Sequence, residues 1–132
     1  MADTVDSKVI WDGKRRKVLH LTNVCDGTGE SAVIKADIST YTGPNGNAPT
    51  RVTIEEIVYS IAGFTSVRLF WDHTTDDEIA VLGTGFGVIP WTAAGGSVDP
   101  ATAGGTGDIL LTTAGNTAGS TYDISIAFRL KD

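Results

Sequence analysis

Residues 121–131 read TYDISIAFRLK, and this stretch decides the fold. Its even positions are large and apolar, whereas its odd positions are small or polar. The apolar residues are Tyr122, Ile124, Ile126, Phe128 and Leu130. Side chains alternate between the two faces of a β-strand, so this period of two predicts a strand with one buried face. Such a face needs a second apolar layer, and the rest of the chain must supply further strands.

A second strand-like run, DILLTT at residues 108–113, precedes this stretch. Residues 114–119, AGNTAG, lie between the two runs and provide glycines that tolerate positive φ angles. The two runs are therefore predicted to face each other as a hairpin.

Further β-prone runs lie upstream. In residues 51–61 the alternation slips at Glu55 and Glu56, which predicts a bulge or a change of partner sheet. A helix is the weaker alternative there, because the run is rich in β-branched residues and lacks a cap. Residues 62–64 are predicted to turn the chain into a hairpin. The predicted strands cover residues 18–24, 32–38, 51–61, 66–72, 79–82, 88–91, 108–113 and 121–131.

These strands predict an all-β protein of about eight antiparallel strands in a jelly-roll-like β-sandwich. A chain of 132 residues suits one domain with its own core. The predicted organisation is an N-terminal arm with a basic cluster at residues 1–17, followed by a single β-sandwich domain at residues 18–132.

The composition excludes several classes of partner. Ten basic and 16 acidic residues give a formal charge of −6, which argues against binding to nucleic acid or to an anionic membrane. The sequence contains neither a secretion signal nor an apolar run long enough to span a bilayer. Cys25 is the only cysteine, so no internal disulfide is possible. We expect a protein that folds in a reducing cytoplasm, with Cys25 as a small buried residue.

An apolar segment and a basic run form the candidate interface near the N-terminus. The segment at residues 9–13 is either a short strand or an arm that docks elsewhere. The run at residues 14–17 is either a solvated strand end that discourages edge pairing or a contact for an acidic surface or phosphate. The candidate interface consists of Val9, Ile10, Trp11, Lys14, Arg15, Arg16 and Lys17.

Three polar or glycine-rich stretches superficially suggest chemistry. Residues 26–31 lack the ligand spacing of a calcium loop, and residues 73–78 are predicted to be an acidic turn. Residues 83–87, GTGFG, are predicted to be a turn because no helix follows to bind phosphate. No catalytic, metal or cofactor site is predicted. Residues 92–107 hold almost no large side chains, and we expect this loop to become ordered only against a partner.

Five short phrases are distributed along most of the chain. They are WDGKRRKV at residues 11–18, DGTGES at 26–31, VYSI at 58–61, VRLFWD at 67–72 and GDILLTT at 107–113. Together, from about residue 9 to residue 130, they resemble a family of small virion proteins of tailed bacteriophages. The member type that the chain most resembles is a capsid decoration, or cement, protein.

The resemblance implies a structural protein that binds the outer surface of the head and stabilises contacts between major capsid subunits. It implies a homo-oligomer, with a trimer favoured, that is assembled in the bacterial host cytoplasm. In this interpretation residues 9–11 anchor the protein and residues 14–17 face an acidic capsid surface. Deletion of residues 1–17 is then expected to abolish or strongly weaken capsid binding and to leave the fold intact.

Three alternatives stay open. Fold and family alone do not fix the position of a protein in the virion, so a head-tail connector, tail or fibre protein is the first alternative. A carbohydrate- or receptor-binding β-sandwich is the second, if Trp11, Trp71 or Trp91 is exposed. An enzyme is the third and is disfavoured, because the sequence has no nucleophile elbow, zinc-ligand spacing or P-loop.

Overall fold

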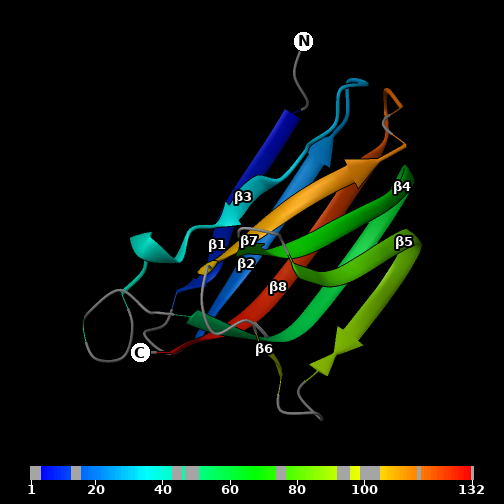
Figure 1. Ribbon diagram of the computed structural model, residues 1–132. Helices are drawn as coiled ribbons and strands as arrows, with labels where there is room; N and C mark the ends of the chain where they lie inside the picture. The colour runs from blue at the N-terminus through cyan, green and yellow to red at the C-terminus, as the bar shows by residue number, and fades with distance from the viewer. Residues whose placement is uncertain are drawn as a thin grey trace.

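The computed structural model describes residues 4–12, 16–42, 46, 51–73, 77–91, 96–98, 105–115 and 117–131. Figure 1 shows an antiparallel β structure. The strands are β1 (Thr4–Asp12), β2 (Arg16–Val24), β3 (Val33–Ala36), β4 (Arg51–His73), β5 (Asp77–Pro90), β6 (Ser97–Val98), β7 (Gly105–Ala114) and β8 (Thr121–Lys131). A 3-10 turn, η1, covers Ile38–Thr40, and Trp91 also has 3-10 conformation. The all-β prediction is confirmed.

All the strands belong to one sheet that nearly closes into a barrel. The order is β1-β2-β8-β4-β7-β3, and β4 also pairs with β5 and β6. Strands β1 and β3 stand at the two ends of this order, so the barrel is open between them. The described part of β1 pairs with β2 alone.

Strand β4 is long enough to serve both halves of the sheet. Its first half pairs with β8 from residue 51 to residue 62, and its second half pairs with β7 from residue 66 to residue 73. The predicted turn at residues 62–64 is wrong, because the chain bends there without ending the strand. Gly63 makes the bend possible: its φ is +90°, and an added Cβ would lie 2.4 Å from Oγ of Ser120. Glycine within a strand often marks such a close approach.

The predicted hairpin between residues 108–113 and 121–131 is also wrong. Strand β7 pairs with β3 and β4, whereas β8 pairs with β2 and β4, and no ladder joins β7 to β8 in the described chain. The reason is the bend in β4. Strand β8 pairs with the part of β4 before the bend, and β7 pairs with the part after it. The connection between β7 and β8 instead packs on the bend through Gly115, whose added Cβ would lie 2.1 Å from Oγ1 of Thr65.

The core lies on the concave side of the sheet and follows the predicted alternation. All five even-numbered apolar side chains of β8 are buried, as are Trp71 and Cys25. The predicted irregularity at Glu55 is confirmed, because the register between β4 and β8 shifts between Ile54 and Glu56. This extra residue keeps Val52 and Ile54 in the core and brings Ile57 and Ile61 to the same face.

A buried ion pair lies behind the turn at residues 26–31. Nζ of Lys35 is 2.5 Å from Oε2 of Glu30, and both side chains are almost fully buried. Asn23 of β2 and Tyr122 of β8 each donate a hydrogen bond to Oε1 of Glu30, at 2.8 and 2.5 Å. Glu30 therefore joins the end of β2 and the start of β3 to β8, whose Tyr122 is 92 positions away, and its role is structural.

Candidate interaction surface

The predicted arm at residues 1–17 contains an edge strand. Strand β1 begins at Thr4 and pairs with β2 through eight residue pairs. Val9 and Ile10 are exposed, at 43% and 57% of their full surface. Trp11 is described only by its backbone, and Lys14 and Arg15 lie outside the described residues. Two of the apolar candidates are thus accessible to a partner.

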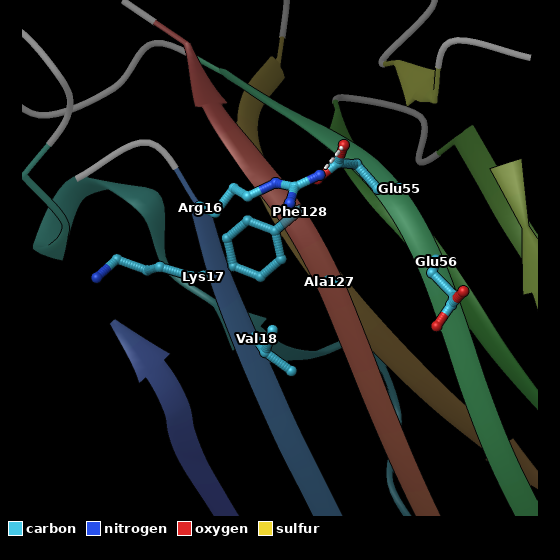
Figure 2. A pocket seen from close by; sticks show the side chains of 7 residues that line it. All are labelled: Arg16, Lys17, Val18, Glu55, Glu56, Ala127 and Phe128. Carbon is cyan, nitrogen blue, oxygen red and sulfur yellow. Dashed lines mark hydrogen bonds and ion pairs between the residues drawn. The ribbon is translucent and has the colours of Figure 1, made fainter. Parts of the chain in front are cut away.

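Arg16 and Lys17 point to opposite faces of β2 (Figure 2). The Arg16 guanidinium reaches across β8 and donates a hydrogen bond to Oε2 of Glu55 at 2.8 Å. This bond and the attraction between the two charges raise the pKa of Arg16, so the guanidinium stays charged at every pH of interest. Lys17 is buried, with Nζ 4.9 Å from the centre of the Tyr41 ring.

A shallow groove of about 330 Å³ lies around the Arg16 side chain. It runs across β2, β8 and β4 near one end of these strands (Figure 2). Its lining residues are Arg16, Lys17, Val18, Glu55, Glu56, Ala127 and Phe128. Arg129 adds a second cation, since its Nε is 3.6 Å from Oε2 of Glu55. Arg16 and Arg129 therefore face Glu55 and Glu56, so two carboxylates offset the charges of these two arginines.

This pairing changes the interpretation of the basic run at residues 14–17. The contact between Arg16 and Glu55 joins residues 39 positions apart, and sequence analysis could not predict it. A guanidinium already bound to a carboxylate attracts an acidic partner less than a free one does. The ammonium group of Lys17 is buried against Tyr41 and is therefore not accessible to a partner. Within the described residues, the exposed apolar side chains are thus the stronger candidates for an interface.

The most exposed large apolar side chain of the described chain is on β5. Phe86 is 75% exposed, and it faces Ser60 of β4 on the outer side of the ladder. Val81 and Val88 of β5 are also exposed. Sequence analysis missed this surface because it assigned residues 83–87 to a turn. The sequence did contain an indication of a strand, because Gly83, Gly85 and Gly87 recur with a period of two. In the structure Gly87 lies directly beneath the ring of Tyr59, where a side chain would not fit.

The other sequence candidates form no reactive constellation. His20 lies 2.6 Å from Asp123 on the outer face of β2 and β8, whereas the His73 side chain lies outside the described residues. Glu78, from the predicted acidic turn, pairs with Arg68. The described side chains include no cluster of three or more metal-ligating groups.

The loop at residues 92–107 and the tryptophans are described in part. Ser97 and Val98 pair with β4 as β6, and β7 begins at Gly105, while residues 92–95 and 99–104 lie outside the described chain. Trp71 is buried and Trp91 packs against the core, so neither offers an open aromatic platform.

Comparison with known proteins adds no relative. No family model, no curated protein and no solved structure matches the chain. A search for membrane spans found no helix in the described residues with the required length and apolar character.

Proposed function

We propose that the chain is a bacteriophage capsid decoration protein, which binds the outer surface of the head and stabilises contacts between major capsid subunits. The proposal begins from the resemblance of the five sequence phrases. The observation that carries it is the outer face of β5, where Phe86 and two valines are exposed. Apolar side chains held this way are typical of sites that bind another protein.

The proposed partner is the major capsid protein, and the proposed location is the outside of the virion. The formal charge of −6 suits a protein that stays away from the packaged DNA. Val9, Ile10 and Trp11, with Lys14 and Arg15 of the basic run, remain the proposed capsid or oligomer interface. Arg16 and Lys17, the other two residues of the predicted interface, contact Glu55 and Tyr41 within the protein. A homo-oligomer and the absence of enzymatic activity belong to the same proposal.

The finer fold belongs to the proposal as well. The bend of β4 divides the ladders into two groups, with β1, β2 and β8 on its first half and β3 and β7 on its second. Two such groups around one core would form the two layers of the proposed jelly-roll-like sandwich. This arrangement supports a sandwich of about eight strands.

The deletion of residues 1–17 is not a clean test of capsid binding. It would remove the whole of β1 and the buried Lys17 together with the exposed residues. Point substitutions separate these effects. Val88→Ser on β5 and Val24→Ser on β2 remove the same apolar group from positions that are 47% and 53% exposed.

The test is quantitative mass spectrometry of purified virions. A decoration protein is expected in amounts comparable to the major capsid protein. The Val88→Ser and Phe86→Ser variants should be depleted from virions by about tenfold or more, whereas Val24→Ser should bind like the original chain. A few copies per virion would indicate a connector, tail or fibre component. Complete absence would overturn the proposal and favour a carbohydrate- or receptor-binding module.

A further inference from the structure

Strand β1 is a free edge of the described sheet with a regular ladder behind it. From Thr4 to Val9 it pairs with β2 without a register shift, and its other edge pairs with no described strand. Strand β3 has only four residues, and the ladder between β4 and β5 shifts register twice. A straight edge with unpaired backbone groups is a template for another strand. Strand β6 has only two residues, so β1 is the edge best suited to pair with another chain.

The side chains of β1 leave both of its faces incomplete. Val5 and Val9 face Asn23 and Leu19 across the ladder, on the side of the sheet that carries the core. They are nevertheless 41% and 43% exposed. Asp6 and Lys8 lie on the opposite face, where their charged atoms are 3.2 Å apart and exposed. The edge thus presents an apolar row on one face and a charged pair on the other.

We infer that two copies of the chain pair antiparallel through β1, with Ser7 of each copy facing Ser7 of the other. Backbone geometry limits the choice of register. Alternate residues of a strand direct their N–H and C=O groups to a given edge. Facing residues of an antiparallel pair have their side chains on the same face of the sheet, whereas neighbouring residues of one strand do not. In a pair of identical strands related by a twofold axis, one residue must therefore face its own copy in the other chain.

Charge decides among the central registers. A strand pair centred on Asp6 would bring two carboxylates face to face, and a pair centred on Lys8 would bring two ammonium groups face to face. Like charges directly opposite each other are destabilising in a ladder. A pair centred on Ser7 places Asp6 of each copy opposite Lys8 of the other. The four charges then alternate in sign, both along each strand and across the new ladder.

The same register completes the apolar face. It places Val5 of each copy opposite Val9 of the other, so two valine pairs extend the core side of the sheet from one copy into the next. The segment VDSKV, residues 5–9, is thus complementary to itself in chemistry on both faces. This complementarity identifies a second copy as the occupant of the edge, and it does not depend on the virion function proposed above.

The test is sedimentation equilibrium of charge variants. The original chain should show a monomer-dimer equilibrium. Asp6→Lys or Lys8→Asp alone places like charges opposite each other at two positions and should weaken the dimer by about tenfold or more. The double variant with both substitutions restores opposite charges and should dimerise within about threefold of the original chain. Circular dichroism should show an unchanged fold for all of them, since both positions are exposed.

Mixing the two single variants provides the sharpest control. Neither variant keeps the ion pair within its own strand, yet a mixed pair has opposite charges at every facing position. The mixture should associate more tightly than either variant alone. A chain that stays monomeric up to about 1 mM, a trimer, or single variants that associate like the original chain would each overturn the inference.

Discussion

Strands β8 and β1 are separated only by β2 in the same sheet, yet they differ in how completely the molecule covers them. Strand β8 has a neighbour on each edge and buries each of its even-numbered side chains. Strand β1 has a neighbour on one edge, and Val5 and Val9 stay exposed on its core side. Both have side chains suited to one covered face. The difference indicates that β8 holds the fold together and that β1 is available to a partner.

The largest expected effect comes from truncating a central side chain of β8. Phe128 is fully buried, and its ring stacks with Tyr41 at a centroid distance of 6.1 Å. Phe128→Ala should lower the free energy of unfolding by about 3–5 kcal/mol in urea titration. Val9→Ala on β1 should lower it by about 0.5 kcal/mol or less in dilute solution, where the chain is monomeric. Equal losses would contradict the contrast between the two strands.

The ion pair that anchors the start of β8 should have the next largest effect. Glu30→Gln leaves the buried ammonium of Lys35 without its counter-charge and should cost about 3 kcal/mol. The double variant Glu30→Gln with Lys35→Met removes both charges and should regain most of that loss. If the single variant unfolds at the same urea concentration as the original chain, the pair contributes nothing to this region.

The bend of β4 lies between the half that pairs with β8 and the half that pairs with β7. Two glycines with the same backbone conformation, one at the bend and one outside it, allow a test of its importance. Gly63 and Gly119 have φ angles of +90° and +91°, but only Gly63 has a neighbour within reach of an added Cβ. Gly119→Ala should cost about 1 kcal/mol for the backbone conformation alone. Gly63→Ala should cost at least about 1 kcal/mol more, because Ser120 must move. Identical melting curves would mean that the bend tolerates a side chain.

The smallest effect is expected at the groove between β2 and β4. Arg16→Gln removes an exposed partner of Glu55 and should lower the urea concentration at the unfolding midpoint only slightly at low salt. The difference from the original chain should shrink in high salt, because counter-ions screen exposed charges. A loss that is large and independent of salt would show that the groove is part of the rigid core.

Local periodicity predicted the parts of the fold that depend on local sequence. The buried face of β8, the irregularity at Glu55 and the burial of Cys25 all follow from residue type and spacing. The strand partners of β7 and β8 could not be predicted in this way, because they depend on the contact between Gly63 and Ser120, which are 57 positions apart. A glycine marks a turn and a bent strand equally well in sequence.

The candidate surface was predictable only in part, for the same reason. The exposure of Val9 and Ile10 fits the segment that sequence analysis selected. The neutralisation of Arg16 by Glu55 needed the tertiary arrangement, because β8 brings β2 and β4 together. Phe86 was hidden among glycines that indicated a turn. Its exposure follows from the pairing of β5 with the bent β4.

Amide hydrogen exchange, followed residue by residue as the protein concentration rises, tests the contrast between β8 and β1 most directly. We expect slow exchange throughout β8 at every concentration, because its amides are paired on both sides. We expect alternate amides between Val5 and Val9 to become slower to exchange as copies associate through the free edge of β1. Exchange in β1 that does not change while the protein self-associates, or protection that appears along β5 instead, would contradict this contrast.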